Sequence, residues 1–510
     1  MFSLNVRCVQ NSAKLDKILL FTLGKLRNYV SVTAAQRIIN ITTAASTNIN
    51  NNTQSNKSKR GAILEIKQLT RYYSSADTKM KNFKEFHLMD YDIIGFDLDG
   101  TLLRYNLNNM VPLEHKLLRE FLVKEKNYPK ELLEQKFDSQ FIQKGLIIDS
   151  DRGNILKLSS DGTILKAAHG TRFLNDKEIC QVYGEARKWD VAQQYIKDPL
   201  AAWNGPLADK LRTLLDYFDI AASLVFAQTV DVLDRLAPNN KLTKNDYKIW
   251  PDMLSGLIQI YSREHFATGA SAYFEALKGN PEKYLLKTDR KVIDLLKQLK
   301  ASGKALYLLT GSNIDFANFT ASYALGPQWR DLFDCTIGFA KKPGFFFAQR
   351  PFLQIANLNE LEGSELTLSE HLKPNSCYSQ GNWQQLKESL CKQVLNKDPQ
   401  EVRSLYVGDN LIQDVYTPKA KASIDTLALS EELLEYDENY EFKTIVQSPL
   451  WGSYYCINAT PTLWSSIIAK YSQLCVSHMD VMTDVPLEEK INCTNKEGYF
   501  PQQPEGLLEN

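Results

Sequence analysis

Cysteine and histidine are scarce in this chain of 510 residues, which has eight cysteines and six histidines. The cysteines are scattered and include no Cys-x-x-Cys pair, and the histidines show none of the spacings of a metal site. These absences argue against a disulfide framework and against a zinc site. We therefore expect reduced thiols and histidines with structural roles.

The chain also lacks a long apolar run and a net charge. The longest run near the N-terminus, residues 18–23, is too short to span a bilayer, so no membrane span is expected. Sixty basic residues balance sixty acidic ones, but residues 1–80 hold twelve basic against three acidic residues, which leaves the remainder at −9. Because residues 81–510 carry this net negative charge, they are a poor surface for nucleic acid, and no nucleic-acid partner is expected.

The basic N-terminal segment differs in composition from the rest of the chain. It has an amphipathic stretch at residues 15–30 and a polar tract, residues 46–59, rich in Asn and Ser. Residues 71–75, Arg-Tyr-Tyr-Ser-Ser, resemble a matrix-processing site. These features predict that residues 1–82 are a disordered mitochondrial transit peptide and that the protein resides in the mitochondrial matrix. The alternative is an untargeted extension on a cytoplasmic protein.

The most informative segment is Ile93-Ile-Gly-Phe-Asp97-Leu-Asp99-Gly100-Thr101, in which an apolar, strand-like run ends in two carboxylates and a glycine turn. A strand of this kind delivers Asp97 to the edge of a sheet, and the glycine lets Asp99 turn toward the same point. Ligands of open α/β sheets bind at that edge. The segment therefore predicts an acidic ligand site, and the alternative is an ordinary turn rich in Asp and Gly.

Three later segments also end an apolar run in polar residues suited to a phosphoryl group. They are residues 305–312 with Thr310 and Gly311, residues 334–344 with Lys341 and Lys342, and residues 404–414 with Asp409 and Asp414. Each has a structural alternative of its own, namely a capped helix start, a solvated charge pair, and a glycine turn with an N-cap. Their shared position at strand ends favours a single phosphoryl-transfer site.

Helical and strand-like segments alternate in the second half of the chain. A helix is predicted at 289–301, where Gly303 ends it before a strand at 305–309, and another at 382–395 precedes a strand at 404–407. This alternation implies parallel crossovers and an α/β, doubly wound, mostly parallel Rossmann-like sheet.

The 212 residues between Asp97 and Thr310 are far more than a crossover requires. They predict a large, mainly helical inserted cap domain with a hairpin-like stretch at 153–167, placed to cover the ligand edge and exclude water. The expected order is core at 83–106, cap at 107–287, core at 288–460, and a partly disordered helical tail at 461–510.

The four motifs resemble those of the haloacid dehalogenase superfamily of aspartate-nucleophile phosphatases, which match Asp97-x-Asp99-Gly-Thr, Thr310, Lys342 and Gly408-Asp409-x-x-x-x-Asp414. More narrowly, the chain is similar to the purine-type 5′-nucleotidase family. That similarity rests on Gly153-Asn-Ile-Leu-Lys-Leu, Gly162-Thr-Ile-Leu-Lys-Ala-Ala-His169-Gly170, Lys342-Pro-Gly-Phe-Phe, Tyr378-Ser-Gln-Gly-Asn382 and Trp451-Gly-Ser. It covers residues 88 to 460 and implies a haloacid dehalogenase-like core with an inserted cap.

The resemblance implies a role for each motif. Asp97 is the nucleophile that forms an aspartyl phosphate, and Asp99 protonates the leaving oxygen and later takes a proton from water. Thr310, Gly311 and Lys342 bind the phosphoryl group, and Lys342 also stabilises charge in the transition state. Lys341 is the weaker candidate because the family's lysine directly precedes the proline.

The resemblance also implies a Mg²⁺ site. Its metal positions are Asp97, the backbone carbonyl of Asp99, and Asp409, and Asp414 is either a further ligand or a residue that holds one. Mg²⁺ is a hard ion that prefers oxygen ligands, which suits this set.

The expected function is that of a Mg²⁺-dependent phosphomonoester hydrolase, a 5′-nucleotidase acting on nucleoside monophosphates. A second carboxylate at Asp99 argues for a phosphatase over a dehalogenase, which has no alkoxide to protonate. Two departures from the purine-type pattern are Gly311, where relatives place Asn, and Gly100, where an aromatic residue or histidine often stands. His265 with Phe266 is the candidate remnant of a base site.

Because of these departures, two alternatives stay open. One is a regulatory or interaction protein of the same fold with weak or no turnover, and the other is a phosphatase of another small metabolite. The expected partners are a small-molecule phosphomonoester and further copies of this chain in a homo-oligomer.

Overall fold

The computed structural model describes residues 85–203, 205–237 and 247–492. The expectations for the N-terminal extension, its processing pattern and the last residues of the tail lie outside the described residues. Within the described ranges, no helix combines the length and the apolar character needed to cross a membrane. The six cysteines that these ranges contain are all free thiols, as the sequence predicted.

A nine-stranded sheet forms the centre of the fold, in the order β11-β10-β12-β9-β8-β2-β13-β14-β17. Its strands are β2 (Ile93–Phe96), β8 (Ala305–Leu309), β9 (Cys335–Gly338), β10 (Phe352–Ala356), β11 (Asn359–Leu366), β12 (Ser376–Gln380), β13 (Ser404–Gly408), β14 (Asp425–Leu429) and β17 (Leu474–Val476). Strands from β12 to β17 pair in parallel, and β10 and β11 form an antiparallel edge. The expected α/β fold with a largely parallel sheet is confirmed.

Alternate residues of the central strands pack on opposite faces of this sheet. Ile94 of β2 lies opposite Leu306 in the ladder and shares one hydrophobic cluster with it, whereas the neighbouring Ile93 belongs to the cluster on the other face. The next residue of β2 is a glycine, Gly95, because a Cβ there would lie 2.1 Å from the ring of Tyr307. Such double-sided burial explains why these strands are continuous apolar runs.

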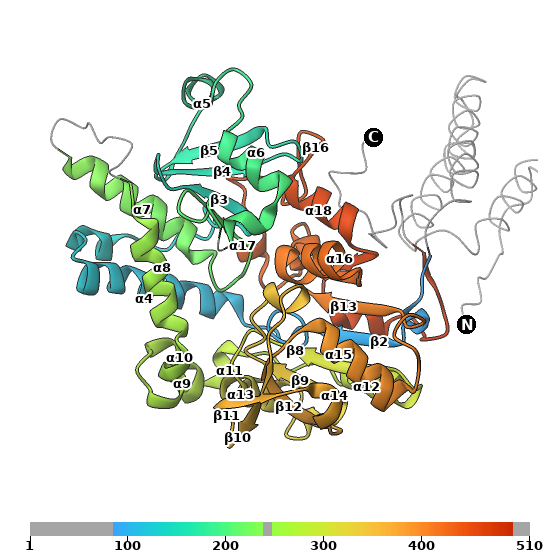
Figure 1. Ribbon diagram of the computed structural model, residues 1–510. Coiled ribbons are helices and arrows are strands. Elements are labelled where there is room, and N and C mark those ends of the chain that lie inside the picture. The colour runs from blue at the N-terminus through green and yellow to red at the C-terminus, as the bar shows by residue number, and fades with distance from the viewer. Residues whose placement is uncertain (1–84, 204, 238–246, 493–510) are drawn as a thin grey trace, which may run out of the picture. The chain divides into compact units, whose positions relative to one another are not determined.

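Helices cover both faces of the sheet (Figure 1). Buried side chains of α12 (Arg290–Ala301) and α13 (Ile314–Ala324) join the cluster of Ile94, and those of α15 (Trp383–Leu390) join the cluster of Ile93. Helix α12 begins where the Asp289 side chain accepts a hydrogen bond from the amide of Lys291 at 2.8 Å. Helix α15 continues as a π-helical turn to Leu395. The helices expected at 289–301 and 382–395 are thus present.

The long insertion leaves and re-enters the core through two paired stretches. Tyr105 forms an antiparallel bridge with Leu285, the amide of Asn106 donates to the carbonyl of Tyr284 at 2.8 Å, and that of Leu286 donates to Arg104 at 3.0 Å. We call these stretches, residues 104–106 and 284–286, the neck. The two stretches of the neck end immediately before residues 107 and 287, the expected first and last residues of the insertion.

The insertion contains an antiparallel sheet in addition to helices. Its order is β6-β5-β4-β3-β7, with β3 (Leu146–Asp149), β4 (Asn154–Leu158), β5 (Ile164–His169), β6 (Arg172–Phe173) and β7 (Leu211–Leu214). The hairpin expected at 153–167 is the β4–β5 pair. The sheet adds β3, β6 and β7 to the expected hairpin.

The helices of the insertion are α4 (Leu107–Lys126), α5 (Asp176–Tyr183), α6 (Asp190–Lys197), α7 (Ala221–Leu236), α8 (Trp250–Tyr261), α9 (Arg263–Thr268), α10 (Ala272–Gly279) and α11 (Pro281–Tyr284). Helices α4, α7 and α8 lie together in Figure 1. Their contact is close, because a Cβ on Gly256 of α8 would lie 2.6 Å from Leu118 of α4.

The remaining elements are β1 (Glu85–Phe86), which pairs with β18 (Ile491–Asn492), and α14 (Leu368–His371), α16 (Thr417–Ala422), α17 (Lys443–Val446), β15 (Cys456–Ile457), β16 (Thr460–Pro461) and α18 (Leu463–Tyr471). Helix α18 agrees with the expectation of a helical segment after residue 460. Strand β17 follows it and extends the central sheet beyond the expected end of the core, because its apolar residues pair with β14.

Candidate active site

The predicted site residues follow neighbouring strands at one edge of the central sheet. Asp97 comes directly after β2, Thr310 after β8 and Asp409 after β13, and Lys342 lies on the loop that follows β9. Because these strands are parallel, their carboxyl ends meet at the same edge. The structure therefore brings side chains separated by more than 300 positions into one cluster.

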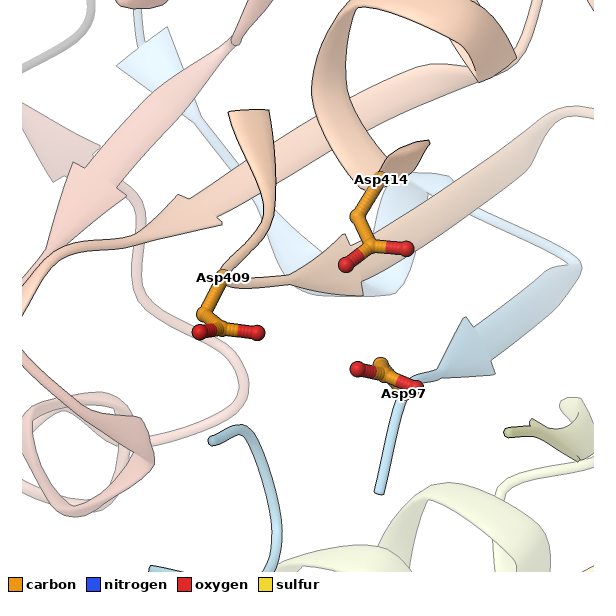
Figure 2. A group of neighbouring side chains, drawn as sticks. All are labelled: Asp97, Asp409 and Asp414. Carbon is orange, nitrogen blue, oxygen red and sulfur yellow. The ribbon is translucent and has the colours of Figure 1, made fainter. Parts of the chain in front are cut away.

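Three carboxylates form the most acidic part of this cluster. One oxygen of each of Asp97, Asp409 and Asp414 lies within 4.8 Å of the others, and all three residues are buried (Figure 2). Asp414 stands on the π-helical segment η9 (Leu411–Tyr416), whose start is capped by the side chain of Asn410.

Two glycines allow these carboxylates to approach the backbone. Gly100 has a φ of +78°, and a Cβ there would lie 2.6 Å from Oδ2 of Asp409. A Cβ on Gly408 would lie 2.6 Å from the carboxyl carbon of Asp414. A glycine at position 100 therefore allows Asp409 to approach the backbone at the site.

Lys342 is the cation of the cluster. Its Nζ lies 2.8 Å from Oδ1 of Asp97 and 2.8 Å from Oδ1 of Asp414, and its side chain is only 4% exposed. Burial alone would lower the pKa of Lys342, but the charges of Asp414 and Asp97 outweigh it and raise the pKa. Lys342 therefore stays protonated. The neighbouring Lys341 lies instead over the ring of Phe339, 3.6 Å from its centroid.

Both oxygens of Asp414 have partners, since Oδ2 accepts a hydrogen bond from the amide of Asn410 at 3.1 Å while Oδ1 contacts Lys342. This arrangement suits a residue that holds Lys342 in place. Asp97 contacts Lys342 through Oδ1, and Asp409 contacts a different lysine.

That second lysine is Lys144, from the insertion, which sequence reasoning missed. Its Nζ lies 3.8 Å from Oδ2 of Asp409 and 3.8 Å from Oε1 of Glu432, and it is buried against the ring of Tyr217. Burial would lower the pKa of Lys144, but Glu432 and Asp409 raise it to about 12. A cation of the insertion thus neutralises an acid of the core.

The three carboxylates fit a hard divalent cation. Burial raises the pKa of Asp97, Asp409 and Asp414, and repulsion from nearby carboxylates, including Asp216 of the insertion, adds to this effect, which Lys342 and Lys144 oppose only in part. A bound cation would relieve this repulsion and lower the three pKa values. The donors are all oxygen, which is the set that Mg²⁺ prefers.

Asp99 lies in a different environment from Asp97. Its Oδ1 accepts a hydrogen bond from the Tyr105 hydroxyl at 2.7 Å, and its Oδ2 accepts from Thr310 Oγ1 at 3.2 Å and from Ser312 Oγ at 2.7 Å. Burial raises the pKa of Asp99, and the three hydroxyl donors only partly offset it. Asp99 is thus a half-buried carboxyl group whose two oxygens accept hydrogen bonds from neutral donors.

Tyr105 and Ser312 are two further site residues that sequence reasoning did not single out. Ser312 had a local signal, because it follows Thr310 by two positions at the same strand end. Tyr105 follows Asp99 by six positions. Whether its hydroxyl reaches Asp99 depends on the path of the chain between them, which no local pattern predicts.

A cavity of about 630 Å³ opens over the cluster. Asp97, Asp99 and Lys342 line it from the core, and Phe218, Tyr261, Arg263 and Phe266 are among the residues that line it from the insertion. The insertion therefore borders the ligand space, as a covering domain would.

Of the candidate residues, Gly311 and Phe266 line this cavity and His265 does not. Gly311 lines it, and a Cβ at this position would meet no atom within 4 Å. Phe266 also lines it, whereas His265 lies beside Gln259, with its Nδ1 2.7 Å from that residue's carbonyl oxygen. Of the two candidates for a base site, only Phe266 thus borders the cavity.

The fold and the site define an α/β protein with a buried cluster of acids, a lysine and hydroxyls at the carboxyl edge of its sheet. The model of the 5′ nucleotidase family matches residues 82–448, which is most of the chain. The protein belongs to the 5′-nucleotidase family.

Curated relatives extend the similarity along the chain. The 5′-nucleotidase domain-containing protein 1 of Homo sapiens is 32% identical over 461 residues, which cover 82% of this chain and 97% of the relative. The protein of the same name from Bos taurus is 31% identical over 458 residues, with the same coverage. The 5′-nucleotidase domain-containing protein 2 of Homo sapiens is 24% identical over 337 residues, which cover 65% of this chain and 58% of that protein.

Proposed function

We propose that the protein is a Mg²⁺-dependent phosphomonoester hydrolase of the haloacid dehalogenase type that removes the phosphate of nucleoside 5′-monophosphates through an aspartyl phosphate. The observation that carries this proposal is the contrast between Asp97 and Asp99. Asp97 lies 2.8 Å from the ammonium group of Lys342, whereas Asp99 is surrounded by hydroxyl donors. Two neighbouring carboxyl groups in such different environments suit a nucleophile and an acid.

In the first step, an oxygen of ionised Asp97 attacks the phosphorus atom and forms the P–O bond of the aspartyl phosphate. The bond from phosphorus to the ester oxygen breaks, and its electron pair stays with the leaving oxygen. Protonated Asp99 donates its proton to that oxygen, so the product leaves as an alcohol.

In the second step, water attacks the phosphorus atom of the aspartyl phosphate. Asp99, now a carboxylate, takes a proton from that water, and the Asp97 carboxylate leaves with the electron pair of its P–O bond. Inorganic phosphate is released, and both residues return to their initial states.

Lys342 and the hydroxyl residues support both steps. The Lys342 charge offsets the repulsion between the Asp97 carboxylate and the incoming phosphate and stabilises the charge of the transition state. Thr310 and Ser312 orient Asp99 through their hydroxyls. Asp97, the backbone carbonyl of Asp99, and Asp409 would hold Mg²⁺, which would supply charge neutralisation at the phosphoryl oxygens.

The size and lining of the cavity favour a substrate larger than a simple phosphate ester. A volume of about 630 Å³ lies in the usual range for small-molecule sites, and aromatic side chains such as Phe218, Tyr261 and Phe266 suit a flat base. The name of the family also points to nucleoside monophosphates.

A panel of phosphomonoesters assayed with Mg²⁺ tests the proposal. The panel holds nucleoside 5′-monophosphates, sugar phosphates and p-nitrophenyl phosphate, with the Asp97→Asn protein as the blank for contaminating phosphatases. We expect the nucleotides to give the highest kcat/KM. No turnover of any ester above the blank would refute the proposal and favour the regulatory or interaction protein.

A phosphatase of another small metabolite is the second candidate, and Gly311 favours it. This position lines the cavity without a side chain, so the protein lacks the amide that purine-type relatives commonly place there. In the same panel, a higher kcat/KM for a sugar phosphate than for every nucleotide would select this candidate.

We also propose import into mitochondria, on the charge excess of residues 1–80 and the pattern at Arg71 to Ser75. N-terminal sequencing of the protein from its native cells should then find a mature chain that starts near Tyr73 or Ser74. An intact Met1 would contradict import and place the protein in the cytoplasm.

A further inference from the structure

Tyr105 occupies an unusual position in the molecule, because it belongs to the neck and also contacts the active site. It forms the bridge with Leu285 at the point where the insertion joins the core. Its hydroxyl donates a hydrogen bond to Oδ1 of Asp99 at 2.7 Å, and the residue is only 4% exposed. A single side chain thus connects the base of the insertion with the leaving-group acid of the proposed mechanism.

The hydrogen bond from Tyr105 complements those from the core. Thr310 and Ser312 both donate to the other oxygen of Asp99, Oδ2, and both follow strand β8. The torsion that rotates a carboxyl group is soft, so the orientation of Asp99 depends on its hydrogen-bond partners. Donors on both oxygens fix the plane of the carboxyl group, and Tyr105 supplies the one on Oδ1.

The ring of Tyr105 is itself held by the insertion. It meets the ring of Phe218 edge to face, with the centroids 5.0 Å apart and the planes at 86°. Phe218 lines the cavity, and its carbonyl accepts a hydrogen bond from the hydroxyl of Tyr261, another cavity residue, at 3.1 Å. The contacts therefore run from the wall of the cavity through Phe218 and Tyr105 to Asp99.

We propose that Tyr105 is a positioning residue that orients Asp99 for proton transfer to the leaving oxygen, and that Phe218 couples this orientation to the insertion. The inference rests on the proposed function and deepens it. Proton transfer needs the acid within hydrogen-bond reach and in line with the leaving oxygen, so loss of this orientation slows the step.

The first test compares two substrates in the Tyr105→Phe protein, which keeps the ring and its contact with Phe218. A nucleoside 5′-monophosphate has a poor alkoxide leaving group that needs the proton, whereas p-nitrophenyl phosphate needs little protonation. We expect kcat/KM for the nucleotide to fall about tenfold more than for the aryl ester. Equal losses on the two substrates, or no loss, would overturn the positioning role.

The control is Tyr307→Phe, which removes another buried hydroxyl from the neighbouring strand β8. Within the described residues this hydroxyl has no hydrogen-bond partner and does not contact Asp99. The ratio of the two kcat/KM values should stay at that of the unmodified protein. Phe218→Leu should shift the ratio in the same direction as Tyr105→Phe, and an unchanged ratio would refute the coupling to the insertion.

The second test does not depend on turnover. A crystal structure of Tyr105→Phe should show the Asp99 carboxyl group rotated from its original plane or in two orientations, with the main chain of residues 97–101 in place. An unchanged, singly ordered Asp99 would overturn the inference. If the unmodified protein hydrolyses no ester, the proposed function fails, and this structure still decides whether Tyr105 positions Asp99.

Discussion

The two walls of the cavity differ in how their side chains are held. On the core wall, Asp97, Lys342 and Asp414 form a buried network of ion pairs at 2.8 Å. On the insertion wall, aromatic rings such as Phe218 and Tyr261 meet edge to face, and Ile258 is 61% exposed. The core wall holds its charges in one geometry, and the insertion wall combines apolar and aromatic side chains with charged ones. We infer that chemistry resides on the first wall and substrate choice on the second.

The strongest test of the core wall is Asp97→Asn. The amide is nearly isosteric but a very poor nucleophile, so kcat should fall by about a thousandfold or more while the fold is kept. The matched control is Asp92→Asn, at the opposite end of β2, where the carboxylate pairs with Lys397 at 2.7 Å. A loss of less than about tenfold in Asp97→Asn, measured as phosphate release, would remove Asp97 from the nucleophile's role.

Replacement of Lys342 should be the next most severe change. Lys342→Met leaves Asp97 and Asp414 buried without a cation, and breaking such a pair costs about 3–5 kcal/mol. We expect a clear drop in the melting temperature and at least about a hundredfold loss in kcat. Lys341→Met, which removes a lysine over the ring of Phe339, should change neither quantity. The reverse result would assign the role to Lys341.

On the insertion wall, Ile258→Ser should alter binding more than chemistry. Ile258 lines the cavity from α8, and the loss of its apolar surface should raise KM for nucleotides about three- to tenfold with kcat nearly unchanged. KM for a small sugar phosphate should stay the same. Val394→Ser, at an exposed apolar residue outside the cavity lining, is the control. A fall in kcat with an unchanged KM would contradict the assignment of substrate choice to the insertion wall.

Gly311 lies on the core wall but should affect substrate choice, which sharpens the comparison. A Cβ there meets no atom within 4 Å, so Gly311→Asn and Gly311→Ala should both fold with an unchanged melting temperature. We expect Gly311→Asn to change the ratio of kcat/KM between purine and pyrimidine nucleotides by a few-fold, and Gly311→Ala to change it less. Identical ratios in all three proteins would mean that this position is not in contact with the base.

The core wall was largely predictable from the sequence, because its residues sit in short patterns. Asp97 and Asp99 lie two positions apart, Asp409 and Asp414 lie five positions apart, and each pair follows the end of an apolar strand. Because the carboxyl ends of parallel strands meet at one edge of the sheet, these patterns were expected to lie together. The central strands were expected from continuous apolar runs, and the helix at 289–301 from the spacing of its apolar residues and the glycine that follows it.

The insertion wall was not predictable in the same way, because its contacts join distant parts of the chain. Lys144 reaches Glu432, which lies 288 positions later, and Tyr105 depends on Phe218 and on the bridge to Leu285. Strand β7 pairs with β3 across some 60 residues that give no sign of it. Such contacts depend on tertiary packing, and no local pattern in a single sequence identifies the partner residues.

The most direct test of the central claim is to trap the phosphorylated protein. The enzyme is mixed with Mg²⁺ and the best substrate of the panel, quenched in acid within the first turnover, digested, and examined by mass spectrometry. We predict a phosphoryl group on the peptide that contains Asp97, and none on the same peptide from Asp97→Asn. A phosphoryl group on another residue, or hydrolysis that proceeds without any phosphorylated peptide, would contradict the account.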